Sequence, residues 1–552
     1  MYDLSYNSIY DKDHLNSKLN QILTKSNIDI NIIKSFAINY YKKYWEKIKE
    51  KIDHNSIDYF SEEIPIEIFS PFLDFSSKSE IFKEIFTIII PVNLITSSDY
   101  QNDYLQYFKK LEESNINYFS IRFLFNNTNN IKFFKKLNIN YNKIKRFFIL
   151  QQYSSKEYIN DYNFFYKELF SIKDIGNNLL YLKIANIEFE EINSFQKINN
   201  FKLLEQLDLS GFNFQNIIKL KIKNLKIVKL EKCKNITFDN NYCFNIKFLS
   251  LKNCFLPVEK ELLKFKQLET LILYSDENKF RQNYSFIIDY FNLVNLLYLS
   301  CETIDFINFK NIQRLEKLNI FSDYYNTNEN EKKIIEKICA IKTLKDISFY
   351  LKEISDKEIS EIEGVNYSVT SMNIYWKNKK DDCILFGLQN KFPNLINLNI
   401  NLPSSYYFGK SNYKTYLEFK YNVLSTIKNI HINGGGNTNI KLYCKYEYLE
   451  SLDIRIQNDI ENLNEAFPFF SDKCPIIFKN LTDFKFEMDD YCLITEDKLE
   501  NLCGNIDRMP QLKTFILKCT TLTINEDFKK EFFLKIKKLK LHLYYFSINK
   551  YH

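Results

Sequence analysis

The sequence predicts an α/β solenoid: a curved horseshoe of stacked repeats with a parallel β-sheet on its concave face, preceded by a small, mainly α-helical amino-terminal region. Two observations carry this prediction. The segments Leu225 to Cys233 and Ile246 to Cys254 share one template, with apolar residues first, fourth and sixth and cysteine ninth, and they start 21 residues apart. The chain also has 552 residues, which exceeds the usual size of one hydrophobic core.

The template recurs through most of the chain. Clear copies begin at Leu204, Leu268, Leu315, Leu395, Leu449, Leu481 and Leu512, and weaker copies at Leu179, Val294, Leu344, Val369, Ile427 and Ile536. This pattern resembles the leucine-rich-repeat family from Leu179 to the end of the chain. The resemblance implies a non-catalytic scaffold that binds a protein partner. The ninth-position ladder is incomplete because other units carry residues such as Phe212 there.

The template also predicts which side chains face inward. Alternate residues of a strand point to opposite faces of its sheet, so the apolar template positions should be buried between neighbouring repeats. No single repeat can bury that face alone, so the stack should be stabilised by contacts between neighbours. The residues between the apolar positions should then line the concave face.

Three regions are expected along the chain. Residues 1–115 lack the template and are predicted to form a helical region or cap, with an amphipathic helix over residues 31–52 that carries Tyr40, Tyr41, Trp45 and Ile48 at helical spacing. Residues 116–178 are predicted to hold degenerate repeats, because residues 116–121 and 134–139 fit the template in part. Residues 179–552 form the predicted leucine-rich-repeat domain.

Several large apolar side chains fall on predicted concave positions. A solvent-facing apolar band of this kind usually marks a binding surface, and tyrosine is well suited to protein interfaces. In a chain that is 16% aromatic, composition alone also places some aromatic residues there. The predicted partner-binding residues are Phe248, Ile272, Tyr274, Leu296, Tyr298, Phe321, Tyr350 and Tyr375.

The following units change character. Their predicted concave positions are polar and could hydrogen-bond a peptide or another polar ligand, although the chain is rich in asparagine throughout. They are Asn397, Asn399, Asn401, Asn429, His431, Asn433, Ser451, Asp453 and Arg455.

A second resemblance lies near the amino terminus. Residues 64–75 read I-P-I-E-I-F-S-P-F-L-D-F and resemble the opening of an F-box, with Ile64, Pro65, Glu67 and Leu73 among the matching positions. This resemblance implies an alternative function, a substrate-recognition adaptor that docks subunits of a cullin ubiquitin ligase. Pro71 departs from the family pattern because proline disfavours continuation of the expected helix. The alternative interpretation of this stretch is an ordinary helix entry within the cap.

Other classes of function lack support in the sequence. A net charge of +6 from 75 basic and 69 acidic residues does not indicate a nucleic-acid footprint. No zinc-ligand spacing, phosphate-binding loop or nucleophile motif is present, so we expect no enzyme activity, metal or cofactor. The eleven cysteines are interpreted as buried small side chains. Without a signal peptide or an apolar run long enough to span a membrane, the protein is expected to be cytoplasmic and not membrane-bound.

Overall fold

The structure is a computed structural model of the 552-residue chain. It describes residues 119–125, 144–151, 178–185, 193–239, 241–255, 265, 267–275, 293–301, 312–320, 328–351, 354–376, 385–402, 415–419, 426–435, 438–442, 448–457, 470, 478–489, 494–506, 508–519, 522–523, 527–528, 530–532, 534 and 545–549.

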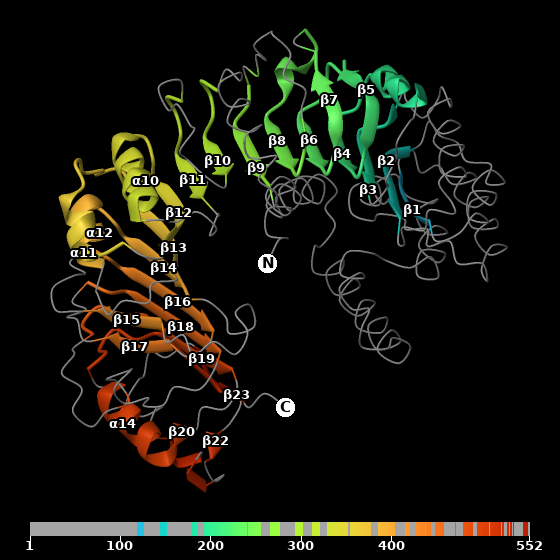
Figure 1. Cartoon of the computed structure of the whole chain (residues 1–552). Coiled ribbons are helices and arrows are strands. Elements are labelled where there is room, and N and C mark those ends of the chain that lie inside the picture. Colours follow the sequence, from blue (N-terminus) through green and yellow to red (C-terminus); the bar gives the residue numbers. More distant parts are fainter. Residues whose placement is uncertain are drawn as a thin grey trace, which may run out of the picture. The chain divides into compact units, whose positions relative to one another are not determined.

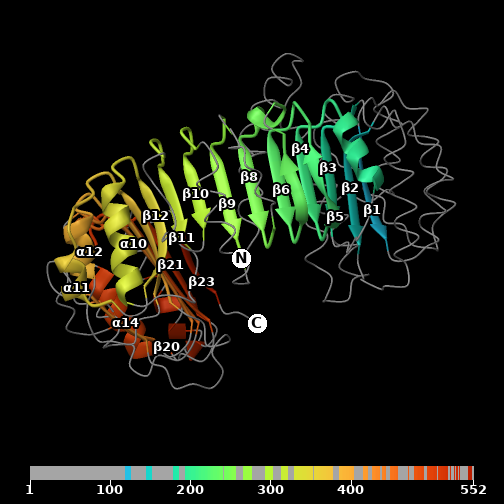
Figure 2. The same ribbon diagram turned by 45° about the horizontal axis from the view of Figure 1, so that its top comes forward.

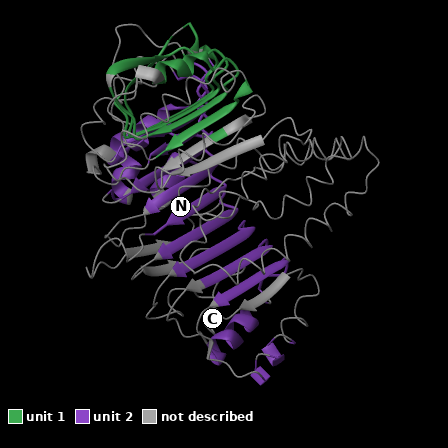
Figure 3. Cartoon of the chain, turned by 90° about the vertical axis from the view of Figure 1, so that its right-hand side faces the viewer, with its two compact units in different colours: residues 1–265 green, residues 266–552 purple. Residues whose placement is uncertain are grey.

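The chain divides into two compact units, residues 1–265 and residues 266–552 (Figure 3). In the first unit, six described strands pair in parallel, each with the next along the ladder. They are β1 (Phe119–Phe125), β2 (Ile144–Gln151), β3 (Tyr181–Ala185), β4 (Gln206–Ser210), β6 (Ile227–Glu231) and β8 (Phe248–Lys252) (Figure 1). The expected parallel sheet is therefore present.

The interior of the first unit follows the template. Leu204, Leu225 and Ile246, the first residues of three successive repeats, are each fully buried. The fourth and sixth positions, such as Leu249 and Leu251, are buried as well. Each repeat hides its apolar side chains against those of its neighbours, which is how a solenoid builds one continuous core.

The ninth template position forms a column inside the first unit. Cys233 and Cys254 are fully buried, and the Sγ of Cys254 donates to the carbonyls of Leu230 and Lys252, each at 3.2 Å. Phe212 occupies the same position one repeat earlier and packs against Phe195 and Phe214, with ring centroids 5.2 and 5.5 Å away. The ladder is therefore filled by either a thiol or a ring.

The chain turns sharply just before this column. Gly211, Lys232 and Asn253 stand 21 residues apart and have φ of 84°, 52° and 52°, in the left-handed region. The turns at Gly211 and Lys232 direct the chain into a second, two-stranded parallel sheet of β5 (Asn213–Leu220) and β7 (Lys234–Phe238). The described part of the unit also contains two 3-10 helices, η5 (Asn193–Asn200) and η6 (Cys243–Asn245).

The second unit contains a ladder of eleven described strands, again all parallel. In order they are β9 (Thr270–Tyr274), β10 (Tyr298–Cys301), β11 (Lys317–Ile320), β12 (Asp346–Leu351), β13 (Ser371–Trp376), β14 (Asn397–Asn401), β16 (Asn429–Gly435), β18 (Ser451–Gln457), β19 (Asp483–Asp489), β21 (Thr514–Cys519) and β23 (Tyr545–Asn549). Two small parallel sheets lie apart from the ladder: β15 (Thr415–Phe419) with β17 (Thr438–Leu442), and β20 (Ile494–Thr495) with β22 (Leu522–Thr523).

Helices return the chain between some of these strands. They are α10 (Asn328–Ala340), α11 (Asp356–Glu361), α12 (Leu385–Lys391) and α14 (Glu496–Ile506). Helix α11 starts at a capping box, in which Ser355 and Glu358 satisfy each other's backbone N–H groups. Helices α10, α11 and α12 lie on one side of the second unit's sheet (Figures 1 and 2). The opposite side is the concave face of the solenoid.

One hydrogen bond recurs from repeat to repeat and fixes their alignment. The second residue of a repeat donates its backbone N–H to the carbonyl of the second residue of the preceding repeat. Examples are Lys247 to Lys226 at 2.8 Å and Thr370 to Lys345 at 2.9 Å. The fold is thus an α/β leucine-rich-repeat solenoid. In the part of the chain that the structure describes, no helix is both long and apolar enough to cross a membrane.

Candidate functional site

The concave face of the second unit carries its outward side chains in three rows that run across the strands. Strand pairing aligns the outward residues of neighbouring strands, so each row holds one residue per strand. The third row contains Tyr350, Tyr375, Asn401, Asn433, Arg455, Glu487 and Lys518. The second row, beside it, contains Ser348, Asn373, Asn399, His431, Asp453 and Lys485.

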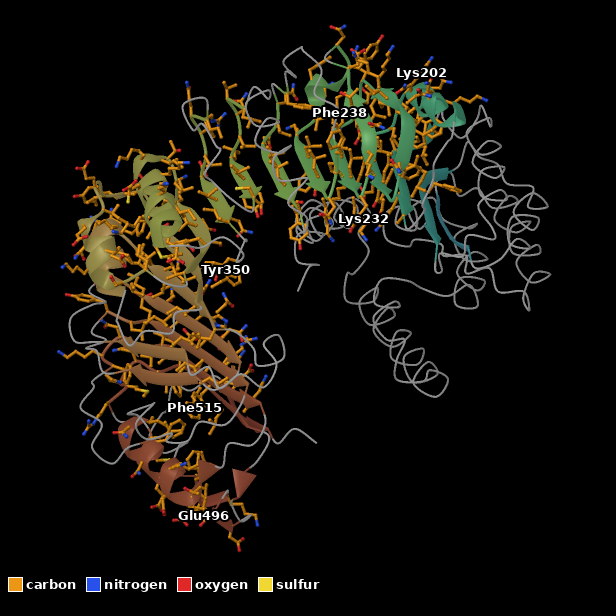
Figure 4. All side chains as sticks on the ribbon, viewed as in Figure 1. Lys202, Lys232, Phe238, Tyr350, Glu496 and Phe515 are labelled. Atoms are coloured by element: carbon orange, nitrogen blue, oxygen red, sulfur yellow. The ribbon has the colours of Figure 1, made fainter. Side chains whose placement is uncertain are left out.

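An aromatic pair lies at one end of the third row. Tyr350 on β12 and Tyr375 on β13 stack with ring centroids 4.5 Å apart and planes inclined by 18°. Both side chains are half-buried, so each ring keeps part of its surface open to solvent. Figure 4 shows Tyr350 on the side of the strands away from α10. Since stacking holds each ring, the pair presents a pre-ordered aromatic surface.

Asparagine side chains follow the tyrosines. Asn401 donates its Nδ2 to the Oδ1 of Asn373 at 2.5 Å, and Asn373 donates to the hydroxyl of Tyr375 at 3.4 Å. Asn429 donates to the Oδ1 of Asn397 at 2.6 Å. A side-chain amide has two donor hydrogens and an acceptor oxygen with two lone pairs, so these contacts leave hydrogen-bonding capacity on the face.

Charged side chains occupy the far end of the second and third rows. The charged cluster consists of His431, Asp453, Arg455, Lys485, Glu487 and Lys518. The Oδ2 of Asp453 lies 3.1 Å from His431 Nδ1 and 3.4 Å from an Arg455 Nη. Glu487 receives Lys518 Nζ at 2.7 Å and Lys485 Nζ at 3.2 Å, while Arg455 Nε lies 3.3 Å from its Oε2. Arg455 therefore bridges the two carboxylates.

The two carboxylates are held in the charged form. Burial raises the pKa of Asp453, but hydrogen bonds from His431 and Arg455 outweigh burial and bring the pKa below its usual range. Burial likewise raises the pKa of Glu487, and hydrogen bonds from Lys518 and Lys485 reverse that effect. Glu487 is 13% exposed whereas Arg455 is 44% exposed, so the acids lie deeper and a cation lies at the surface.

The structure corrects the position of Leu296. The template was read as starting at Val294, which placed Leu296 on the concave face. The N–H of Leu297 instead bonds the carbonyl of Glu269, and Leu299 pairs with Leu271, so the repeat starts at Leu296. Leu296 precedes β10 and is fully buried, so it cannot contact a partner. Because the error is two residues, Tyr298 still lies on an outward strand position.

The other predicted residues separate into different places. Phe248 belongs to the first unit and is only 8% exposed, with Lys229 Nζ 5.6 Å from its ring centre, so it offers almost no contact surface. Ile272, Tyr274 and Tyr298 are half-buried on β9 and β10. Polar Ser300, Asn319 and Ser348 occupy the second row on β10, β11 and β12, so the predicted residues do not form one unbroken apolar band.

Some residues fall outside the described ranges, namely Phe321, the predicted helix at residues 31–52, and the F-box-like residues 64–75. The predicted repeat at Ile536 is also corrected, because the strand that pairs with β21 is β23, which begins at Tyr545. Three residues of the charged side of this face, Lys485, Glu487 and Lys518, are not among the residues predicted from the sequence. The template applied to the repeats at Leu481 and Leu512 places all three outward, so the signal was present.

Within the described ranges, no group of three or more histidine, cysteine, aspartate or glutamate side chains is arranged to hold a metal ion. The charged cluster contains only two carboxylates and one histidine, and its carboxylates are already paired with cations. This arrangement is suited to contacts with polar and charged groups of another molecule.

No protein-family model and no curated protein matches the chain. Among solved structures, the chain is similar to Rad7 in complex with Elc1 from yeast, at 13% identity and a TM-score of 0.26, over 68% of this chain and 93% of that one. It is also similar to the functional domain of InlJ from Listeria monocytogenes, which includes a cysteine ladder, at 14% identity and a TM-score of 0.29, over 66% and 75%. A Bacteroides fragilis protein matches at 14% identity and a TM-score of 0.20, over 43% and 76%.

Proposed function

We propose that the protein is a non-catalytic scaffold that binds a protein partner on the concave face of its second unit. The observation that carries this proposal is the stacked, half-exposed Tyr350–Tyr375 pair. A tyrosine loses little conformational entropy on binding and combines a large contact area with a polar hydroxyl. The neighbouring amides and charges would supply directional contacts around this aromatic centre.

Several side chains of this face are already ordered before a partner binds. Association costs free energy for each side chain that must be immobilised. Stacking already restricts both tyrosine rings, and amide contacts already restrict Asn373 and Asn401. A partner that lies on this surface would therefore gain contacts at a reduced entropic cost.

The experiment compares two double variants of the full chain as bait in lysate from cells that express it. Tyr350→Ala with Tyr375→Ala removes the stacked pair. Tyr367→Ala with Tyr448→Ala is the matched control, since these tyrosines are 64% and 54% exposed and lie outside the strands. We expect specific partners to be lost with the first bait and kept with the second. Equal recovery by both baits would contradict the proposal.

The adaptor function remains a prediction from residues 64–75. The same experiment addresses it with a third bait that lacks residues 60–95. Recovery of cullin-ligase subunits by the wild-type chain, and their loss with this deletion, would support an adaptor that uses the concave face to select its substrate. Reproducible absence of those subunits from the wild-type bait would remove the alternative.

A further inference from the structure

The third row changes chemistry along its length in a fixed order. It begins with the tyrosine pair, continues with Asn401 and Asn433, and ends with Arg455, Glu487 and Lys518. A ligand that crosses the strands therefore meets an aromatic surface, then amides, then charges. This order defines the kind of partner segment that could lie on the row.

The charges at the far end favour an acidic ligand. Within the second and third rows, Arg455, Lys485 and Lys518 carry three positive charges against the two negative charges of Asp453 and Glu487, and on the third row alone Arg455 and Lys518 outnumber Glu487. The exposed fractions are 44%, 23% and 26% for the three cations. They are 23% for Asp453 and 13% for Glu487, so Arg455 and Lys518 are more exposed than either of these carboxylates.

The same count argues against a polyanion. One excess positive charge can pair with one or two carboxylates, whereas a nucleic acid would bring a phosphate for every nucleotide close to Asp453 and Glu487. Asp483 on β19 is a further acid, on the first row, which contains Ser451, Asp483 and Thr514 on successive strands. It accepts a hydrogen bond from its neighbour Thr482 at 2.6 Å. It adds repulsion for a long polyanion that covers more than one row.

The spacing of the strands fixes the length of the segment. Tyr350 and Lys518 are separated by six inter-strand steps. At about 4.8 Å per step, the span from Tyr350 to Lys518 along the row is about 29 Å. An extended chain covers about 3.3 Å per residue, so about nine residues match the row. Tyr375 and Arg455 are three steps apart, about 14 Å, which corresponds to about four residues of the ligand.

We propose that the third row binds an extended, acidic segment of a partner protein, about nine residues long. An aromatic or apolar side chain of the segment lies on Tyr350 and Tyr375. One or two carboxylates, about four to seven residues away, pair with Arg455 and Lys518. The asparagines between them hydrogen-bond its backbone. This inference rests on the proposed function and adds the chemical class of the partner.

A peptide selection tests the proposal directly. Random nine-residue peptides displayed on phage are selected against the full chain. The expected peptides carry an aromatic or large apolar residue and, about four residues from it, one or two aspartates or glutamates. No enrichment, or enrichment of peptides without acidic residues, would overturn the proposal.

Affinity measurements then locate the contact. An enriched peptide is synthesised with a fluorescent label, and its binding is followed by anisotropy. Lys518→Met with Arg455→Met should weaken binding at least tenfold, because charge-assisted hydrogen bonds are lost. Lys513→Met is the matched control, since Lys513 is exposed in the same repeat as Lys518 but precedes its strand. Amide exchange of β18 and β21 in each variant shows whether the sheet remains folded.

The outcomes separate this inference from the proposed function. If peptide binding requires Tyr350 and Tyr375 but is unchanged without Arg455 and Lys518, the proposal of an acidic segment is wrong and the proposal of a binding face is supported. If peptide binding requires none of these residues, and native partners also bind the tyrosine variant, both fail. If a twelve-nucleotide oligo-dT binds the full chain more tightly than the enriched peptide does, the row would be assigned to single-stranded nucleic acid. Self-association that the methionine variants abolish would assign it to a second copy of this chain. Either result would overturn the acidic-peptide assignment.

Discussion

Replacement of Asp453 by asparagine is the sharpest test of the charged cluster. The change keeps the size of the side chain and removes its charge. The Asp453 carboxylate lies within 4 Å of cationic or potentially cationic groups on three side chains: His431 at 3.1 Å, Arg455 at 3.4 Å and Lys485 at 3.9 Å. In the variant, Arg455 and Lys485 lose the negative charge of Asp453 and keep their contacts with Glu487.

The magnitude follows from this geometry. Asp453 is 23% exposed, which places it between a surface ion pair, worth up to about 1 kcal/mol, and a buried one, whose disruption costs about 3–5 kcal/mol. The distances of 3.4 and 3.9 Å are long, so the lower part of this range applies. We expect Asp453→Asn to lower the local free energy of unfolding by about 1–2 kcal/mol at pH 7.

The difference in stability between wild type and Asp453→Asn should also depend on pH. The pKa of Asp453 is lowered in the folded protein, so its charge stabilises the fold at any pH above the ordinary unfolded pKa of about 3.9. That contribution is lost as the pH falls through the still lower folded pKa. The difference between wild type and variant should therefore be complete at pH 7, still nearly complete at pH 5, and should shrink below about pH 4.

The assay is native-state hydrogen exchange of the full chain, read by mass spectrometry on peptides that cover β18 and β19. A loss of 1–2 kcal/mol corresponds to exchange about 5–30 times faster. Asp527→Asn is a matched control, because Asp527 is almost fully exposed, with only a 3.5 Å contact to Lys530. Equal exchange in wild type and Asp453→Asn at pH 7, or a difference that persists unchanged at pH 3, would refute the reasoning.

Three further predictions concern the framework of the solenoid. Lys232→Gly should slow amide exchange in β6 about fivefold, because a non-glycine residue at φ 52° costs about 1 kcal/mol of stability. Gly211→Ala should accelerate amide exchange in β4, because it introduces the same backbone strain. Unchanged exchange rates in both variants would contradict the presence of strain at these turns. Leu296→Ala should lower the free energy of unfolding of the second unit by about 2–5 kcal/mol, measured by urea denaturation, because Leu296 is fully buried. An unchanged free energy of unfolding would contradict this burial. Burial raises the pKa of the Cys254 thiol. Burial also raises the pKa of Cys339, to about 11, although Lys391 and Lys342 partly offset this effect. Site-resolved alkylation at pH 8 should therefore label both cysteines only after unfolding, and rapid labelling of the native chain would contradict their burial.

The start of the repeat at Leu296 could not be predicted from the sequence. Residues 293–299 read L-V-N-L-L-Y-L, so more than one apolar residue could serve as the first position of the template. The hydrogen bond from Leu297 to Glu269 and the pairing of Leu299 with Leu271 identify Leu296 as the first position. At Phe248 the template assigned the correct face, but burial depends on neighbouring residues that the template does not include.

The repeat, the parallel sheet and the inward positions could be predicted from the amino-acid sequence alone, because a period of about twenty residues with fixed apolar spacing buries its leucines when the repeats stack. The sequence also assigned Tyr350, Tyr375, Asp453 and Arg455 to outward positions. Only the tertiary structure decided which of these side chains meet. Arg455 and Glu487 come from separate repeats and touch because strand pairing aligns them, and that alignment depends on the path of the chain between the strands. Local spacing fixes the direction of a side chain, whereas its neighbours are fixed by how the repeats stack.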